Sequence, residues 1–329
     1  STLDRSSAAS DVYKRQVLDD GSMFHGFSFG FDKAVAGEVV FNTAMTGYPE
    51  SLTDPSYAGQ LMVLTYPLVG NYGVPPFSIE ENGLPTFMES EKIHAEAIIV
   101  SDYSEEYSHW NAVESLGDWL KREKIPGITG IDTRALTKKI REHGVMMGRI
   151  VIGTADKEGE SGGEIPDYGS INYVDRVPWN YDFNHLEYDG LFLSNGPGDP
   201  NTCDVAVRNI RKALDRDKPI CGICMGNQLL AKAGGASIYK LKYGHRSHNQ
   251  PVRMVGTEKC FITSQNHGYA VDNDTLGADW EPLFVNMNDG TNEGIRHKTK
   301  PFFSSQFHPE ACSGPTDTEF IFDKFVDLL

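Results

Sequence analysis

The chain has 329 residues, with 46 acidic and 30 basic side chains and a formal net charge of −16. This acidic balance disfavours binding to nucleic acid or to an anionic membrane, because both need a basic surface, and no apolar run is long enough to cross a bilayer. The length allows two domains, and five cysteines, an odd number, favour free thiols in a reducing compartment, so a cytoplasmic location is expected.

The first half of the chain predicts a mixed α and β domain. Residues 1–14 show no hydrophobic period, and we expect them to be a tail outside the fold. Residues 15–154 contain short apolar runs and amphipathic stretches, which predict a domain of their own. Buried strands are expected at residues 39–41 and 61–64, a further apolar strand at 95–100 and an extended segment at 145–152. Helices are expected at 111–123 and 132–144, the second capped by Asp132. Residues 155–176 are polar and rich in glycine, which is typical of a linker.

Residues 177–329 alternate between strand-like and helix-like patterns. Strands are expected at 191–194, 219–221, 260–263 and 301–307, and helices at 204–215, 227–233 and 318–329. This alternation predicts an α/β fold with a mostly parallel sheet that helices cover on both faces. In such folds the functional site lies beyond the carboxyl ends of the strands. The sequence places the turns at 195–199 and 222–226, and also His308, at such strand ends.

Cys224 lies in the most informative of these turns. An apolar strand leads into Gly222-Ile-Cys-Met-Gly226 and a helix follows, which is the arrangement of a nucleophile elbow. Flanking glycines relieve the crowding of a strained turn, and the start of the helix favours the thiolate that attacks a substrate. Cys221 and Cys224 could instead form a redox pair or half of a zinc site, but no second cysteine pair stands at ligand spacing, so no metal is expected. Cys221 lies within the apolar strand and is expected to be structural.

A cysteine nucleophile needs a base, and His308 is the best placed of ten histidines. It ends a strand, and Pro309 keeps it out of a helix. Glu310 can return to the same side of the chain and hold the imidazole ring. Alone, this His-Pro-Glu sequence is a weak signal that is more often structural. The rival histidines, expected in polar turns or loops, are His267, His245 and His248.

The turn Gly196-Pro-Gly198 could bring backbone N–H groups close to a ligand, although an ordinary turn is the simpler interpretation. An oxyanion hole would use the N–H of Met225, which follows the nucleophile, and a second N–H from this turn, with Gly198 as the first choice. The sequence contains no phosphate-binding loop of the Gly-x-x-x-x-Gly-Lys type, so we expect no nucleotide or other cofactor in this chain.

Together, Cys224, His308 and Glu310 resemble the triad of class I glutamine amidotransferases. From about Val17 onward the whole chain resembles the small, glutamine-hydrolysing subunit of carbamoyl phosphate synthase. Three segments carry this closer resemblance: residues 37–48 (Gly-Glu-Val-Val-Phe-Asn-Thr-Ala-Met-Thr-Gly-Tyr), 52–57 (Leu-Thr-Asp-Pro-Ser-Tyr) and 130–137 (Gly-Ile-Asp-Thr-Arg-Ala-Leu-Thr).

The resemblance implies that Cys224 forms a glutamyl thioester with L-glutamine. The released ammonia would pass through a tunnel to a large subunit, which uses ATP, Mg²⁺ and bicarbonate to make carbamoyl phosphate for pyrimidine and arginine biosynthesis. Residues 15–154 would provide much of the contact with that subunit, and Ser56 would reach across to the glutamine. The implied glutamine contacts are Ser56, Gly196, Gly198, Met225, Gln228, Asn266, Gly268 and Tyr269.

The sequence departs from the family pattern at two places. Asn227 stands where the family has histidine, outside the triad. Near Val177 the opening strand and helix of the catalytic sheet have no counterpart, so we expect the native protein to have one more βα unit there. Two alternatives stay open: an amidotransferase subunit of another synthetase, such as one that makes anthranilate or a purine, and a non-catalytic regulatory subunit. The first-half segments argue against the former, and the intact triad against the latter.

Overall fold

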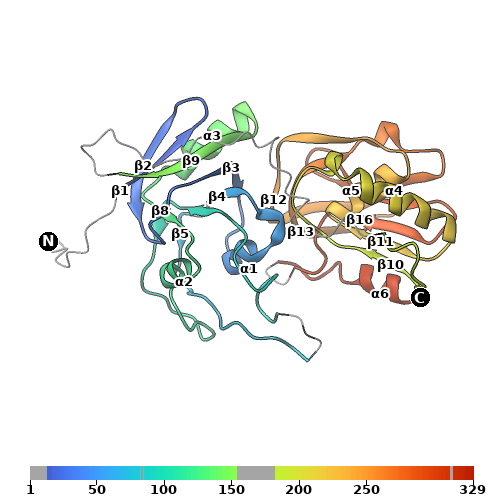
Figure 1. The fold of residues 1–329 in the computed structure, drawn as a ribbon, viewed down its shortest axis with the longest axis horizontal. Helices are drawn as coiled ribbons and strands as arrows, with labels where there is room; N and C mark the ends of the chain where they lie inside the picture. Colours follow the sequence, from blue (N-terminus) through green and yellow to red (C-terminus); the bar gives the residue numbers. More distant parts are fainter. Residues whose placement is uncertain (1–12, 82, 84, 154–181, 312–313) are drawn as a thin grey trace. The chain divides into compact units, whose positions relative to one another are not determined.

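The computed structural model describes residues 13–81, 83, 85–153, 182–311 and 314–329, which divide into two compact units (Figure 1). The first unit contains the described parts of residues 1–41, 59–76 and 95–168, and the second contains those of 42–58, 77–94 and 169–329. This division differs from a first domain that runs unbroken over 15–154, because two segments of that stretch pack with the second unit. The expected linker at 155–176 and the junction near Val177 lie outside the described residues.

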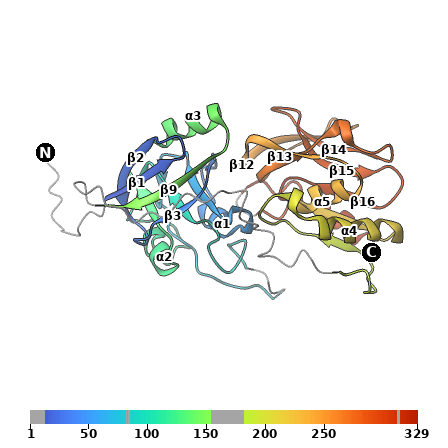
Figure 2. The same ribbon diagram turned by 45° about the horizontal axis from the view of Figure 1, so that its top comes forward.

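Seven strands of the first unit close into a barrel, in the order β1-β2-β8-β6-β4-β3-β9. Figure 2 shows β1 with its two antiparallel partners, β2 and β9. The barrel strands are β1 (Tyr13–Leu18), β2 (Met23–Ser28), β3 (Val35–Asn42), β4 (Gln60–Leu64), β6 (Ala97–Ile99), β8 (Gly127–Thr129) and β9 (Met146–Ile152). The four strands expected in this half are confirmed, because apolar side chains such as Val39, Leu61 and Ile98 fill the barrel and are fully buried.

The barrel begins earlier than the sequence predicts. Tyr13 and Lys14 were expected in the tail, but they open strand β1. The Lys14 side chain is fully buried, and its ammonium donates to the carbonyl oxygen of Phe31 at 2.9 Å and lies 3.4 Å from a carboxylate oxygen of Asp32. These partners satisfy the charge inside the barrel, and a polar strand of this kind lacks the apolar pattern that would have revealed it.

Two helices and a short strand pair complete the first unit. Helix α3 (Thr133–His143) begins and ends as predicted, since the Asp132 carboxylate accepts from the N–H of Ala135 and Gly144 closes the last turn at φ 96°. Helix α2 (Leu116–Arg122) starts five residues later than the expected position, because Ser115 is the residue that caps it. Strands β5 (Leu68–Val69) and β7 (Asp102–Tyr103) pair in parallel.

The second unit is built on a seven-stranded sheet in the order β10-β11-β16-β15-β14-β12-β13. Strands β10, β11 and β16 run parallel, and the remaining neighbours pair antiparallel. The α/β class is therefore confirmed, but the sheet is mixed rather than mostly parallel. The strands are β10 (Leu191–Leu193), β11 (Ile220–Ile223), β12 (Ile238–Met254), β13 (Cys260–Val271), β14 (Trp280–Asn286), β15 (Asn292–His297) and β16 (Phe302–Ser305).

Helices cover both faces of this sheet (Figure 1). On one face, α4 (Asp204–Ala213) and α5 (Met225–Ala233) bury side chains such as Ile210 and Leu229 against the strands. On the other, α6 (Phe320–Val326) packs Ile321 and Phe325 beside Phe303 of β16. Short 3₁₀ turns complete the unit: η4 (Pro200–Thr202), η5 (Leu214–Arg216) and η6 (Asn273–Thr275). No helix of the described residues is long and apolar enough to span a membrane.

The segment 42–58 belongs to the second unit although it comes from the first half of the chain. It contains helix α1 (Tyr48–Thr53) and the 3₁₀ turn η1 (Pro55–Tyr57). The N–H of Thr43 donates to the carbonyl oxygen of Arg246 at 3.2 Å, and the Asn42 amide donates to the Tyr57 hydroxyl at 2.9 Å. These bonds hold the segment at strand β12, beside the expected site.

Candidate active site

Cys224 occupies a sharp turn between strand β11 and helix α5. Its backbone has φ 52° and ψ −104°, in a region that L-residues rarely adopt. Helix α5 starts at Met225, two residues earlier than predicted, because Cys224 itself takes the N-cap position. The flanking glycines are sterically required: a Cβ on Gly222 would lie 2.6 Å from the carbonyl oxygen of Gly226, and one on Gly226 would collide with the carbonyl oxygen of Leu193. The predicted elbow geometry is confirmed.

The two cysteines of this segment differ in their surroundings. The Cys224 side chain is buried, and its Sγ lies 3.8 Å from the carbonyl oxygen of Asn266 on strand β13. Cys221 is fully buried in the strand, and burial raises the pKa of its thiol to about 12. Both are free thiols. A redox pair needs a thiolate that can be reached, so the surroundings of Cys221 do not favour that alternative.

His308 lies three residues beyond strand β16, where its N–H donates to the carbonyl oxygen of Ser264 at 2.9 Å. Its Nδ1 is 2.8 Å from Oε1 of Glu310, and its Nε2 has no hydrogen-bond partner among the described residues. Burial alone would lower the pKa of His308, but the Glu310 carboxylate and the nearby Cys224 sulfur outweigh it and hold this pKa well above the usual value. The structure therefore brings together the three residues that the sequence singled out.

The rival histidines do not lie in loops. His245 and His248 are part of strand β12 and His267 is part of strand β13, and all three are buried or nearly so. Burial lowers the pKa of His248 to about 4, and it lowers the pKa of His267 well below the usual value. The prediction of polar turns was wrong because these strands carry polar side chains inward, where they form a hydrogen-bonded network.

The expected glutamine contacts are distributed over four parts of the second unit. Ser56 is in η1, and its hydroxyl is buried without a hydrogen-bond partner among the described residues. The Gln228 amide already has protein partners, because it donates at 3.1 Å to both the carbonyl oxygen of Tyr269 and Oε1 of Gln306. Of the others, Gly196 and Gly198 follow strand β10, Met225 opens helix α5, and Asn266, Gly268 and Tyr269 lie on strand β13.

Asp54 is a site residue that the sequence analysis missed. Its carboxylate accepts from the Asn266 amide at 2.8 Å, from the Ser56 N–H at 2.8 Å and from the Asn195 amide at 3.5 Å. It therefore connects η1, strand β13 and the turn after β10. The signal was present, because Asp54 stands inside the segment 52–57 that carries the family resemblance, but a single aspartate before proline also fits an ordinary turn.

An acidic cavity adjoins His308. Its carboxylates are those of Glu50, Asp54 and Glu89, and neither Cys224 nor the turn at Gly198 contributes to the lining. Burial, reinforced by the charges of Asp54 and Glu310, raises the pKa of Glu89 to about 8. The complete lining is Asn42, Glu50, Ser51, Asp54, Tyr57, Glu89, His248, Ser264, Gln265, Asn266, His308 and Ala311.

Two segments of the chain match models of known protein families. Residues 168–328 match the family model of class I glutamine amidotransferases, and residues 16–150 match that of the CPSase domain of the carbamoyl-phosphate synthase small chain. The chain is 44% identical to the carbamoyl phosphate synthase arginine-specific small chain of Chaetomium globosum over 371 aligned positions, which cover 99% of this chain and 80% of that relative.

One further relative and one solved structure match the chain over a smaller share of their own length or of this chain. The multifunctional protein CAD of Squalus acanthias is 47% identical over 350 positions, which cover 94% of this chain, although the chain spans only 16% of that protein. A solved structure of a glutamine amidotransferase from Thermotoga maritima has a TM-score of 0.34 and 23% identity, covering 43% of this chain and 62% of that one.

The second unit thus contains a class I glutamine amidotransferase domain. The chain as a whole belongs to the family of carbamoyl phosphate synthase small chains. The 371 aligned positions exceed the 329 residues present here, so the Chaetomium globosum relative has residues with no counterpart in this chain. The missing βα unit near Val177 stays a prediction.

Proposed function

We propose that this chain hydrolyses L-glutamine and delivers the ammonia to the large subunit of a carbamoyl phosphate synthase. The observation that carries the proposal is the placement of Cys224 at positive φ, at the start of a helix and beside the His308–Glu310 pair. A strained nucleophile next to a buried, oriented base is the arrangement that acyl transfer requires. Family membership supports the same reaction class.

The residues divide the chemistry between them. The Cys224 sulfur attacks the side-chain amide carbon of glutamine, and the N–H groups of Met225 and Gly198 stabilise the oxyanion. His308, protonated in the free enzyme because its pKa is raised, gives a proton to the departing ammonia. The neutral ring then takes a proton from the water that cleaves the thioester. Glu310 orients the ring through Nδ1 and stabilises its charged form.

Glutamine recognition is assigned to the remaining predicted contacts. Asp54 fixes the Asn266 amide by a 2.8 Å hydrogen bond, and it also holds the turn of η1 that presents Ser56. The Ser56 hydroxyl has no protein partner among the described residues, which leaves it available to a ligand. Gln228 takes a supporting role, because its amide already binds Tyr269 and Gln306.

The partner and the pathway are parts of the same proposal. ATP, Mg²⁺ and bicarbonate are assigned to the large subunit, and the first unit is assigned to docking on it. Ammonia released into water would be protonated and lose its nucleophilicity, so the two sites need a sealed connection. Relatives include an arginine-specific small chain and multifunctional proteins, and the product is assigned to arginine or pyrimidine biosynthesis in the cytoplasm.

A glutaminase assay with two matched cysteine variants tests this function. Cys224→Ser should abolish ammonia release from glutamine, because serine in this environment is a far weaker nucleophile. Cys221→Ala, three residues earlier in the same segment, should keep most of the activity because its thiol lies within the strand. Both should be assayed with and without a large subunit. Wild-type rates in the Cys224 variant would contradict the proposal.

A further inference from the structure

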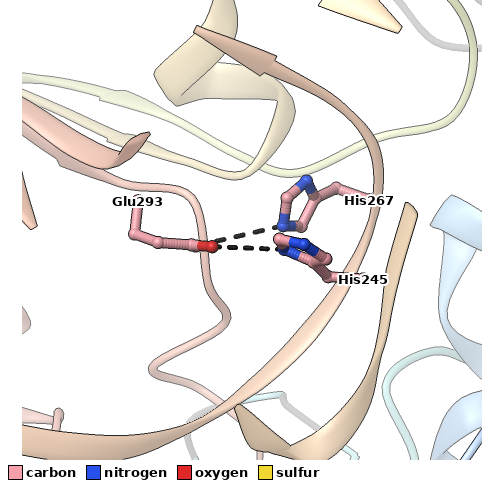
Figure 3. A group of neighbouring side chains, drawn as sticks. All are labelled: His245, His267 and Glu293. Atoms are coloured by element: carbon pink, nitrogen blue, oxygen red, sulfur yellow. Dashed lines mark ion pairs between the residues drawn. The ribbon is translucent and has the colours of Figure 1, made fainter. Parts of the chain in front are cut away.

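Three buried side chains of the second unit converge outside the proposed triad. His245 comes from strand β12, His267 from strand β13 and Glu293 from strand β15. One nitrogen or oxygen atom from each lies within 4.8 Å of the others. Figure 3 shows the Glu293 carboxylate pointing at the two imidazole rings. The Glu293 and His267 side chains are almost completely inaccessible, and the His245 side chain is 10% exposed.

The outer nitrogen of each ring already has an acceptor. His245 Nε2 lies 2.9 Å from a carboxylate oxygen of Asp289, and His267 Nδ1 lies 2.8 Å from the carbonyl oxygen of Tyr269. A carbonyl oxygen can only accept, so the proton of a neutral His267 is on Nδ1. Carboxylates and backbone carbonyls in these positions are the partners that usually orient metal-binding histidines. When both rings are neutral, the inner nitrogens, His245 Nδ1 and His267 Nε2, have lone pairs directed at the centre. In the ion-free chain the carboxylates of Asp289 and Glu293 outweigh the effect of burial and raise the pKa of His245 to about 9, so a cation would bind there in competition with a proton.

The centre of this cluster has an excess of acceptors. Oε1 of Gln265 lies 3.1 Å from both inner ring nitrogens, and Oε2 of Glu293 has no hydrogen-bond partner among the described residues. The Gln265 amide nitrogen is directed away, toward the Thr263 hydroxyl at 3.1 Å. The nearest donor is the Asn286 amide, which lies 2.9 Å from Glu293 Oε1 and 3.5 Å from His245 Nδ1.

A single proton would not satisfy this arrangement. A proton on His245 Nδ1 would serve Gln265 or Glu293, at 3.1 and 3.3 Å. It would leave His267 Nε2 and Glu293 Oε2 without a donor, and a buried acceptor of this kind costs stability. A cation at the centre could instead bind both inner ring nitrogens, the Glu293 carboxylate and Gln265 Oε1 together.

The spacing of the four atoms fits a small tetrahedral ion. Ligands at 2.0–2.2 Å from such an ion lie about 3.3–3.6 Å apart. Each inner ring nitrogen lies 3.1 Å from Gln265 Oε1. His245 Nδ1 lies 3.3 Å from Glu293 Oε1, and His267 Nε2 lies 3.9 Å from the other carboxylate oxygen, Glu293 Oε2, so either oxygen of Glu293 can be the ligand. Two imidazoles and one carboxylate are ligands that zinc prefers, and the carboxylates of Glu293 and Asp289 would balance its charge.

We propose that His245 Nδ1, His267 Nε2 and Glu293 bind one Zn²⁺ ion, with Gln265 Oε1 as the fourth ligand. The ion joins strands β12, β13 and β15, and His267 stands directly between Asn266 and Gly268 of strand β13. Its role is structural, because all four ligand positions are taken by protein and none remains for substrate. The proposal does not depend on the glutaminase assignment, because metal content and spectra test it without an activity measurement.

The test uses the full chain carrying Cys224→Ser, so that the proposed nucleophile cannot bind the metal. After removal of metals, titration with Zn²⁺ should give one tightly bound ion per chain, and Co²⁺ should give the intense visible absorption of a tetrahedral site. X-ray absorption of the zinc form should show nitrogen and oxygen ligands alone. A sulfur ligand, or the absence of a stoichiometric ion, would overturn the proposal.

Variants locate the ion. Glu293→Gln preserves the shape of the side chain but removes the anionic ligand, and it should weaken zinc binding by about 100-fold or more. Asp289→Asn removes the charge of the residue that holds the outer nitrogen of His245 and also accepts from Thr291. It should weaken zinc binding by about 10- to 100-fold and keep the stoichiometry. His297→Asn is the matched control, because this histidine lies on the same strand β15 outside the cluster. Unchanged affinity in the first two variants, with circular dichroism showing intact folds, would place the ion elsewhere and refute the assignment.

Discussion

Replacing Glu89 with glutamine tests the electrostatics of the acidic cavity beside His308. Burial and the charges of Asp54 and Glu310 raise the pKa of Glu89 from an ordinary value of 4.5 to about 8. The folded chain therefore binds this proton more tightly than the unfolded chain, and the free energy of unfolding falls as the pH rises from 4.5 to about 8. The resulting loss of unfolding free energy is at most about 5 kcal/mol above pH 8, and less than about 1 kcal/mol at pH 5.

Glutamine retains the size of the side chain but carries no charge at either pH. Glu89→Gln should therefore match the wild type at pH 5 and be more stable at pH 9, by up to about 5 kcal/mol. Urea denaturation at the two pH values measures this difference. The control is Glu91→Gln, an exposed carboxylate two residues further on, which should show no comparable pH dependence. An identical effect of Glu89→Gln at pH 5 and pH 9 would refute the electrostatic reasoning.

Three further variants address the elbow, the base and the glutamine pocket. Gly226→Ala should destabilise the second unit by more than about 3 kcal/mol and abolish glutaminase activity, since its methyl group would collide with Leu193; Gly277→Ala, which makes only ordinary contacts, is the control, and a stable, active Gly226 variant would contradict the elbow geometry. Glu310→Gln should lower kcat less than His308→Asn does. The Glu310 charge raises the pKa of His308, so Glu310→Gln should also move the alkaline limb of the kcat/KM profile to lower pH. An unshifted limb would exclude this electrostatic coupling between Glu310 and His308. Asp54→Asn should raise KM for glutamine by about 10- to 100-fold, as expected for the loss of a charged hydrogen bond of about 1.5–3 kcal/mol; an unchanged KM would remove Asp54 from the pocket.

The parts of the site that could be predicted from the sequence are local. The elbow is one short segment with glycines on both sides, and its steric logic is independent of the rest of the fold. His308 and Glu310 are two residues apart, so a strand end is sufficient to bring them together. Helix α3 was predictable for the same reason, because Asp132 and Gly144 cap it from adjacent positions.

The parts that escaped prediction depend on tertiary contacts. Asp54 reaches Asn266 across more than two hundred residues, and no local pattern signals that hydrogen bond. Polar side chains in strands β12 and β13 suggested loops, since buried polar networks mimic the composition of turns. The His245, His267 and Glu293 cluster draws on three strands, whereas a search for cysteine pairs looks only at neighbours in sequence. Lys14 was missed because the partners of its ammonium, Phe31 and Asp32, lie after the next strand, β2.

The most direct test of the central claim is to identify the residue that carries the glutamyl group. The wild-type chain should be mixed with glutamine, quenched in acid within a turnover, digested and examined by mass spectrometry. The account predicts a glutamyl adduct on the peptide that contains Cys221 and Cys224, with fragmentation assigning it to Cys224, and loss of the adduct in Cys224→Ser. An adduct on Cys221, or glutamine turnover with an adduct on neither cysteine, would contradict it.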